Sequence, residues 1–224
     1  MNSEEILLKL AECVEFGKVN NAAPFPPTMK GQDGADELTK QALEMGVRPV
    51  DILNEALIKA MDRVGEKFTQ KKIFVPQMLM AAKAMNASME HLKPFFQSGE
   101  VKRKGKFIIG TVSGDLHDIG KNLVAMIVEG AGWEVIDLGV DVSAAKFLQA
   151  IKDNEGAVVG LSALLTTTMQ SMKNIVAEIK REYPNVTCLI GGAPVTDQFR
   201  EEIGADGYSS DPQGAVNYLN ALVA

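Results

Sequence analysis

The sequence predicts an α/β protein in two parts, a helical bundle followed by a doubly wound, five-stranded parallel sheet. Residues 1–96 show helical patterns of apolar residues and no strand pattern, whereas residues 105–224 alternate short apolar runs with helical patterns. Between them, residues 97–104 (QSGEVKRK) are polar and charged and lack periodicity. A linker between two domains is therefore expected there.

Four helices are expected in the first part of the chain. In each, apolar residues recur every three or four positions, which is the spacing of one helix face. Gly17 and Gly46 are expected to end the first two helices, Pro76 suits the first turn of the fourth, and Pro94 is expected to end it. Together they predict a four-helix bundle. The expected helices cover residues 4–16, 37–45, 50–68 and 76–94.

Two features of the helical part bear on function. Residues 20–34 hold three prolines and two glycines, so a loop is expected between the first two helices. Methionines gather on the fourth helix, where a flexible side chain either fills gaps in the core or adapts to a large apolar ligand or partner. These methionines are Met78, Met80, Met85 and Met89.

The second part alternates strands and helices, which predicts a flavodoxin-like or Rossmann-like sheet with helices on both faces. A strand order of 2-1-3-4-5 places the first and third strands beside the point where the order reverses, and ligands bind at that point, outside the carboxyl ends of the strands. The expected strands cover residues 107–112, 134–138, 157–161, 187–190 and 206–209. The expected helices cover residues 119–131, 143–153, 168–182, 196–203 and 213–222.

Composition and charge narrow the classes of function. The net charge of −6 argues against a broad surface for nucleic acid or for an anionic membrane. The first residues carry acids where a signal peptide has a basic region, and no apolar run reaches the length of a membrane span. Cys13 and Cys188 have no metal-type spacing; they could pair, but reduced thiols in a cytoplasmic protein are expected.

Polar and glycine-bearing stretches follow four of the expected strands. Because the carboxyl ends of parallel strands meet at one edge of a sheet, these stretches are expected to converge on one site. They read SGDLHDIG at residues 113–120, SALLTTTM at 162–169, GGAP at 191–194 and GYSSD at 207–211.

His117 is the main candidate for chemistry, and the only other histidine, His91, is assigned none. His117 could be an ordinary loop histidine, but its neighbours favour a site. Asp115 can accept the proton of one ring nitrogen, which leaves the other nitrogen free as a ligand. Gly114 and Gly120 let the backbone approach a bulky group. With no second histidine or cysteine nearby for a zinc site, one imidazole suits a metal whose other ligands come from a cofactor.

The residues at the other strand ends could have structural roles as well as functional ones. Ser162 and the run Thr166–Thr168 precede a helix, and at least one of these hydroxyls is expected to cap it. A cap needs one hydroxyl, so the run also suggests a polar lining. Gly191 and Gly192 suit a tight strand-to-helix turn, which leaves a functional role open. No Gly-Lys-Ser/Thr phosphate loop is present, and no GxGxxG follows the first strand.

Three motifs together resemble a known family. DLHDIG at residues 115–120 has the Asp-x-His-x-x-Gly signature of cobalamin-binding domains, and SAL at 162–164 and Gly191-Gly192 follow at family-like distances. Residues 64–85 (VGEKFTQKKIFVPQMLMAAKAM) look like the helical cap of this family. The whole chain resembles the small corrinoid proteins of bacterial and archaeal methyltransferase systems and the cobalamin module of methionine synthase. It departs from them in the Pro-rich stretch 20–34, where relatives have a shorter link.

The resemblance implies a role for each candidate residue. It implies cobalamin bound with its own base off cobalt, His117 as the lower axial ligand of the metal, and Asp115 as the partner of that imidazole. Thr168 stands where relatives carry a serine that completes this relay. The remaining residues implied as contacts of the cofactor or its nucleotide tail are Gly114, Leu116, Asp118, Ile119, Gly120, Ser162, Leu164, Thr166, Thr167, Gly191, Gly192, Tyr208 and Ser209.

The resemblance also implies a function, that of a methyl carrier. One substrate-specific methyltransferase would load the protein, as methylcobalamin, and a second would pass the methyl group to an acceptor such as tetrahydrofolate or a thiol. A reductive activator would restore oxidised cobalt. Methoxylated aromatics (as in O-demethylases), methylamines, methanol and betaines are all donors for related carriers.

Three other classes compete with a methyl carrier. The small subunit of an adenosylcobalamin-dependent mutase shares the motif but typically lacks the helices expected over residues 4–92. A cobalamin-dependent sensor adds a DNA-binding headpiece, and no basic helix for one is present. A receiver-like signalling domain needs an aspartate at the end of the third strand, where Leu161-Ser162 offers no carboxylate.

Overall fold

The computed structural model describes residues 2–223, which form two compact units. One unit holds the chain up to Arg103 together with Gly130–Gly132, and the other holds Lys104–Glu129 and the chain from Trp133 onward. In the described part of the chain, no helix has both the length and the apolar character needed to cross a membrane.

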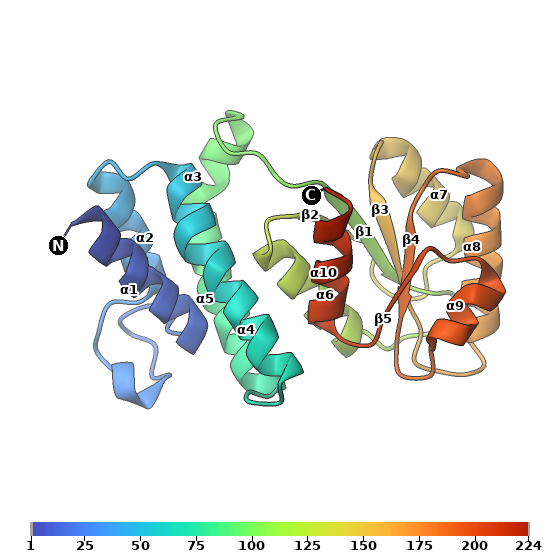
Figure 1. The fold of residues 1–224 in the computed structure, drawn as a ribbon, viewed down its shortest axis with the longest axis horizontal. Coiled ribbons are helices and arrows are strands. Elements are labelled where there is room, and N and C mark those ends of the chain that lie inside the picture. Colours follow the sequence, from blue (N-terminus) through green and yellow to red (C-terminus); the bar gives the residue numbers. More distant parts are fainter. Residues whose placement is uncertain (1, 224) are drawn as a thin grey trace. The chain divides into compact units, whose positions relative to one another are not determined.

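The first unit is helical, as expected (Figure 1). Helix α1 packs against α2, α4 and α5, and α2 and α4 each pack against α5. Apolar side chains from all four helices fill the core, among them Leu10, Leu38, Met61 and Leu92. The elements are α1 (Ser3–Phe16), η1 (Pro27–Met29), α2 (Ala35–Glu44), α3 (Pro49–Asp51), η2 (Ile52–Ile58), α4 (Lys59–Thr69) and α5 (Val75–Gln97).

Local chemistry explains where α1 begins and ends. The Asn2 side chain accepts a hydrogen bond from the Glu5 amide at 2.8 Å, and the Glu5 carboxylate accepts one from the Asn2 amide at 2.9 Å, which is a capping box. Gly17 ends the helix at φ +75°, and a Cβ there would lie 2.6 Å from the Cβ of Met80. Only glycine fits both the backbone angle and the close approach of α5.

Two details of the helices differ from the prediction. Residues Ile52–Ile58 form a π-helix between α3 and α4, so the expected third helix is continuous but irregular. Helix α5 does not end at Pro94 but runs on to Gln97. The turn after Pro94 keeps its own hydrogen bonds, because the Ser98 amide donates to the Pro94 carbonyl at 3.0 Å. A proline interrupts the bond to the preceding turn but leaves its own carbonyl available.

The methionines of α5 mostly fill the core. Met78, Met85 and Met89 are buried, whereas Met80 is only half-buried. His91 lies on the same helix and contacts α2, with its Nε2 atom 2.6 Å from Oδ1 of Asp36. Its role in the described structure is therefore to hold two helices together.

The second unit is a doubly wound sheet of five parallel strands, which confirms the predicted fold, and its order β2-β1-β3-β4-β5 is the one for which a site beside β1 and β3 is expected. The strands are β1 (Lys106–Thr111), β2 (Glu134–Asp137), β3 (Val158–Ser162), β4 (Cys188–Gly191) and β5 (Gly207–Ser209). The helices are α6 (Ile119–Gly130), α7 (Ala144–Asp153), α8 (Met169–Glu182), α9 (Asp197–Ile203) and α10 (Pro212–Ala221).

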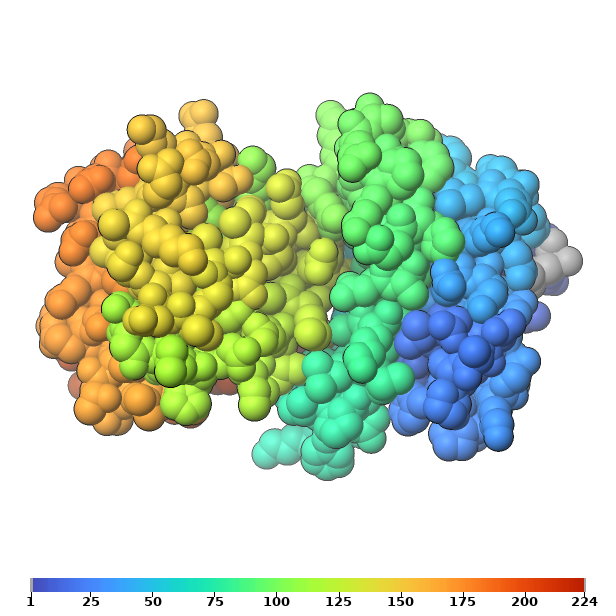
Figure 2. All heavy atoms as spheres, turned by 180° about the vertical axis from the view of Figure 1, so that it is seen from behind, coloured from blue at the N-terminus to red at the C-terminus, as the bar shows by residue number. Residues whose placement is uncertain are grey.

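The two faces of this sheet are covered differently. Helices α7 and α8 lie on one face, over a core that includes Ile108, Val159 and Ile190, while α6 and α10 lie on the other (Figure 1). The far side of α7 is exposed, as the yellow surface of this unit in Figure 2 shows. Side chains alternate between the two faces along each strand. Ile109 pairs with Gly160, and Gly160 pairs with Leu189, so these three residues share the face toward α6 and α10.

Both cysteines are free, buried thiols. Burial raises the pKa of Cys13 to about 11 and that of Cys188 to about 12. The uncharged thiol therefore dominates at neutral pH, and neither cysteine is a reactive nucleophile.

Candidate functional site

The loop between β1 and α6 holds His117 at the carboxyl edge of the sheet. Gly114 turns the chain at φ +84°, and the Thr111 hydroxyl donates to the His117 carbonyl at 2.9 Å. This bond ties the far end of the loop back to the end of β1. The imidazole is left about half exposed, with 51% of the side chain accessible, while Asp115 is fully buried beneath it.

The carboxylate of Asp115 accepts hydrogen bonds on both oxygens. Its Oδ1 accepts from the His117 backbone amide at 3.1 Å and from the His117 Nδ1 at 2.8 Å. Its Oδ2 accepts from the amides of Leu164 and Leu165 at 2.8 and 3.2 Å and from the Thr168 hydroxyl at 2.7 Å. Burial alone raises the pKa of this carboxyl, but the hydrogen bonds together outweigh burial and hold its pKa well below the ordinary range.

The charged state of Asp115 determines the tautomer of His117. An ionised carboxylate accepts hydrogen bonds and donates none, so the Nδ1 atom facing it must carry a proton. A neutral imidazole then has an unprotonated Nε2 with a free lone pair. The orientation of that nitrogen is fixed by a buried, negatively charged neighbour.

Thr168 completes this network but does not cap the helix that follows. It occupies the N-terminal cap position of α8 without a capping hydrogen bond from its side chain. Its Oγ1 instead lies 2.7 Å from Oδ2 of Asp115 and 2.8 Å from the Leu165 carbonyl. The prediction that a hydroxyl of this run caps α8 is therefore wrong, because the hydroxyl is turned back toward the buried carboxylate.

A second loop holds the first in place. Asp141, between β2 and α7, accepts through Oδ1 from the Gly114 amide at 2.7 Å and from the Ser113 hydroxyl at 3.3 Å. Its own amide donates to the Asp115 carbonyl at 3.0 Å. Asp141 adopts a left-handed conformation at φ +52°, which aspartate and asparagine tolerate better than most residues.

Asp141→Ala is expected to lower the free energy of unfolding of this unit by about 1–2 kcal/mol, because two hydrogen bonds are lost and alanine is strained at this backbone angle. Urea denaturation followed by the fluorescence of Trp133, the sole tryptophan, which is buried in the same unit, measures the change. Asp141→Asn is the matched control, since its amide oxygen can still accept from Gly114. Equal loss in both variants would contradict this account.

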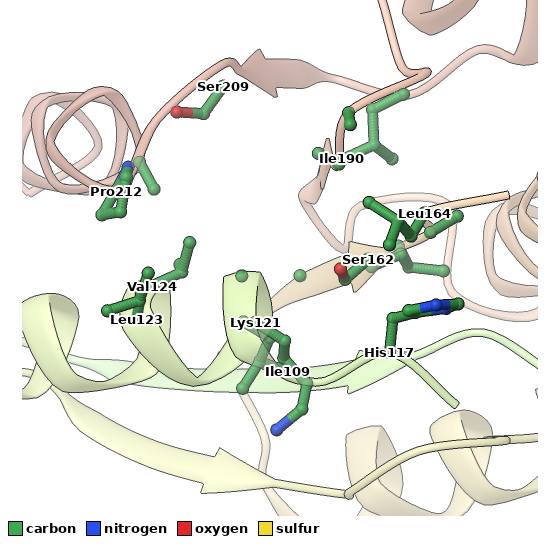
Figure 3. Close-up of a pocket in the computed structure, with 18 of the residues that line it drawn as sticks. Ile109, His117, Lys121, Leu123, Val124, Ser162, Leu164, Ile190, Ser209 and Pro212 are labelled. Atoms are coloured by element: carbon green, nitrogen blue, oxygen red, sulfur yellow. The ribbon is translucent and has the colours of Figure 1, made fainter. Parts of the chain in front are cut away.

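A cavity of about 570 Å³ opens beside His117, between the strand ends and helices α6 and α10 (Figure 3). Of the predicted contact residues, ten line it: Leu116, His117, Asp118, Ile119, Gly120, Ser162, Leu164, Gly191, Gly192 and Ser209.

The other predicted residues lie outside the cavity wall. Asp115 and Thr168 are buried beneath it, and Gly114 turns the loop behind them. Thr166 and Thr167 are exposed to solvent. Tyr208 pairs with Ile190 and packs against the core on the opposite face of the sheet, because side chains alternate along β5.

The cavity also has an apolar lining that the sequence reasoning did not identify. Many of its strand residues lie two positions apart, such as Phe107 and Ile109 or Gly160 and Ser162, so a period of two was the available signal. Gly160 is one of them, and a Cβ there would lie 2.4 Å from Cζ of Phe107. The residues missed on strands and helices include Phe107, Ile109, Gly160, Leu189, Leu123, Val124, Pro212 and Ala215.

Large apolar side chains are exposed around the mouth of the cavity. Leu116 and Ile119, on either side of His117, are 71% and 74% exposed, and Leu164 and Leu165 are 43% and 41% exposed. Exposed apolar residues gathered around a cavity mark a binding surface more often than scattered ones do. The arrangement suits a ligand with a large apolar surface.

Gly192 provides close backbone contact on the other side of the mouth. Its φ is +126°, and a Cβ there would lie 1.8 Å from the Ala163 carbonyl oxygen. The neighbouring Ala163 amide donates to the Gly191 carbonyl at 3.2 Å. The turn after β4 is thereby packed directly on the segment that supplies the Leu164 amide to Asp115.

Both parts of the chain match models of known protein families. Residues 105–217 and residues 32–93 each match a family model described as a B12 binding domain. The second match covers most of the helical unit but not α1. The cavity, His117 and Asp115 all lie within the first.

Individual relatives agree with the family models. The chain is 37% identical to trimethylamine corrinoid protein 1 of Methanosarcina acetivorans, over 84% of this chain and 89% of that protein. It is 35% identical to dimethylamine corrinoid protein 1 of the same organism, over the full length of both. The structure of the methanol:cobalamin methyltransferase complex of Methanosarcina barkeri matches with a TM-score of 0.82 at 28% identity, over 98% of this chain and 80% of that one. This protein is a member of the B12-binding corrinoid protein family.

Proposed function

We propose that this protein carries methyl groups on a cobalamin bound with its own base off cobalt and with His117 as the lower axial ligand. The observation that carries the proposal is the fixed tautomer of His117, whose Nδ1 donates to the buried Asp115 and whose Nε2 is free beside the cavity. An unprotonated imidazole nitrogen is the form that binds a transition metal.

The residues present fit a corrinoid. No group of three or more histidine, cysteine, aspartate or glutamate residues in the described structure could hold a metal ion, so the remaining ligands must come from the cofactor itself. The cavity of about 570 Å³ lies within the range of about 300–1,000 Å³ typical of ligand sites, which accommodates a nucleotide tail. The exposed Leu116, Ile119 and Leu164 offer an apolar surface to the macrocycle.

Each residue has a role in this proposal. When bound, cobalamin supplies a cobalt ion that can accept and release a methyl group. His117 would hold the metal, Asp115 keeps the Nδ1 of His117 protonated and its ring oriented, and Thr168 donates a hydrogen bond to Asp115. Gly191 and Gly192 let the backbone pass close to the nucleotide tail. The side chains around the mouth exclude water from the lower face of the ring.

The helical domain (residues 1–96) and the linker (97–104) have a proposed role as well. The bundle would cover the upper face of the cofactor and shield it from water and oxygen. It would move aside for a partner, and the short polar linker before the α/β domain (105–224) would allow that movement. The match of residues 32–93 to a B12 binding domain supports a role of the bundle toward the cofactor.

The partners follow from the same proposal. A substrate-specific methyltransferase would load the carrier, a second methyltransferase would pass the methyl group to tetrahydrofolate or a thiol, and a reductive activator would restore oxidised cobalt. Relatives named for trimethylamine and dimethylamine, aligned over most or all of this chain, support methylamines as the class of methyl donor.

A labelling experiment tests the lower ligand. Protein labelled with ¹⁵N-histidine and loaded with cobalamin in the cobalt(II) state is expected to give an electron paramagnetic resonance spectrum whose nitrogen splitting is a doublet, because ¹⁵N has a nuclear spin of one half. Retention of the cofactor's own base would give the triplet of ¹⁴N. His117→Ala is expected to remove the doublet and weaken binding without abolishing it, since contacts to the ring and tail remain.

The second histidine provides the control. His91 contacts Asp36 in the helical unit, and His91→Ala is expected to keep the doublet. If folded wild-type protein binds no cobalamin, the proposed function fails. If it binds cobalamin but shows the triplet, the function survives and His117 is not the ligand.

A further inference from the structure

The polarity of the cavity wall changes with depth. The lining residues that are most deeply buried are apolar, and four of them come from two strands and two helices: Phe107 (1% exposed), Leu189 (4%), Leu123 (8%) and Ala215 (1%). The lining residues with hydroxyl or carboxylate groups are instead half-buried or exposed: Asp118, Ser162, Ser209, Ser210 and Asp211. The deep end is thus apolar, and the rim carries the hydrogen-bonding side chains.

Lys121 is the exception among the described lining residues, being 3% exposed. Its ammonium group donates to Asp137, at the end of β2, and to Asn122 at 2.6 Å. Figure 3 shows the chain of Lys121 pointing away from the side chains of Leu123 and Ser162. The ammonium group is paired with these two residues, so Lys121 does not make the deep end of the cavity polar.

We propose that the deep end of this cavity selects corrinoids whose lower base is an apolar aromatic ring, such as dimethylbenzimidazole or a cresol, over those whose base is a purine. This inference rests on the proposed function, since it assumes that the nucleotide tail enters the cavity. The ribose and phosphate then lie toward the rim, where the half-buried Ser162 lines the cavity.

Desolvation is the physical reason for the preference. A benzimidazole with two methyl groups, or a cresol ring, brings few polar atoms into the deep end and gains from apolar burial. Adenine brings an amino group and ring nitrogens that hydrogen-bond to water when free. With no side-chain partner at the deep end, those bonds are lost on entry, and each costs binding free energy. The purine form is expected to bind at least tenfold more weakly.

Dissociation constants for three corrinoids test the proposal: cobalamin, the p-cresolyl analogue and the adeninyl analogue, measured by the absorbance change on binding. The free corrinoids differ in how readily the base leaves cobalt. The ratio of the adeninyl to the cresolyl dissociation constant is therefore compared between wild type and variants, because this difference between the free corrinoids is the same for each protein. Ala215→Ser places a hydroxyl at the deep end. Ala193→Ser makes the same change at an exposed position of the wall and is the matched control.

The ratio of the adeninyl to the cresolyl dissociation constant is expected to be at least ten in wild type. It is expected to be severalfold lower in Ala215→Ser and unchanged in Ala193→Ser. Equal binding of the adeninyl and cresolyl forms by wild type would overturn the selectivity while leaving the proposed function intact. An equal fall in both variants would overturn the assignment of selectivity to the deep end. Failure of wild type to bind any of the three would instead overturn the proposed function.

Discussion

Replacing Asp115 with alanine is expected to lower the free energy of unfolding of the α/β unit by about 3–5 kcal/mol, because buried donors that now bond a carboxylate are left without a partner. These donors are the amides of Leu164 and Leu165, whereas the Thr168 hydroxyl loses the carboxylate but keeps the Leu165 carbonyl as an acceptor. Urea denaturation followed by Trp133 fluorescence measures the loss in protein without cofactor. A loss below 1 kcal/mol would contradict the network described above.

Asp115→Asn separates stability from chemistry. An asparagine oxygen can accept from the Leu164 side, but its NH₂ group then faces the ring of His117, so Nδ1 must become an acceptor and Nε2 must carry the proton. The expected cost in stability is about 1–2 kcal/mol, smaller than for alanine. The expected chemical effect is large, because a protonated Nε2 cannot bind a metal.

The imidazole ¹⁵N chemical shifts of His117 report its tautomer directly. Wild type is expected to show a protonated Nδ1 and Asp115→Asn a protonated Nε2, with loss of the nitrogen doublet in the cobalt(II) spectrum. Thr168→Ser, which retains a hydroxyl, and Thr168→Val, which removes it, are a matched pair that should keep the wild-type tautomer. If Asp115→Asn leaves the tautomer unchanged, Asp115 does not set it.

Gly192→Ala is expected to cost more than 3 kcal/mol of unfolding free energy, or to move the turn after β4, because the new Cβ cannot coexist with the Ala163 carbonyl. The Cβ would lie 1.8 Å from that oxygen, and the backbone angle of +126° disfavours any side chain. Moving the turn displaces the wall of the cavity, so corrinoid affinity is expected to fall at least tenfold.

Gly204→Ala is the control for backbone strain alone. Gly204 ends α9 at φ +72°, and a Cβ there would meet nothing within 4 Å. It is expected to cost about 1 kcal/mol and to leave corrinoid affinity unchanged. A loss of affinity equal to that of Gly192→Ala would show that general destabilisation, and not the turn after β4, weakens binding.

The alternation of strands and helices in the second unit and the helical first unit were predictable because they depend on local patterns. Each strand of the second unit is a short apolar run between turn residues, and right-handed crossovers leave few ways to arrange five such units. The structure places β1 at Lys106–Thr111, within one residue of the expected 107–112. The family was equally accessible, because three short motifs occur in order along the chain, at residues 115–120, 162–164 and 191–192.

Features that depend on distant pairing were not predictable. The partners of Asp115 beyond His117 lie about fifty residues along the chain, and two of them are backbone amides, which no side-chain pattern reveals. The position of Thr168 before a helix predicted a cap, and only the family resemblance placed its hydroxyl in the relay with Asp115. Tyr208 was placed at the cavity because a strand of three residues is too short to show which side faces inward.

The cavity wall is built from residues of separate strands and helices, so cofactor binding and the stability of the folded state are coupled. Phe107, Leu189 and Ala215 are far apart in sequence and meet only when the sheet is formed, so an unfolded chain has no comparable site. A ligand that binds only the native state adds about 4 kcal/mol to the free energy of unfolding when its concentration is a thousand times its dissociation constant. Protein that has lost its corrinoid is therefore expected to unfold more readily than protein that holds it.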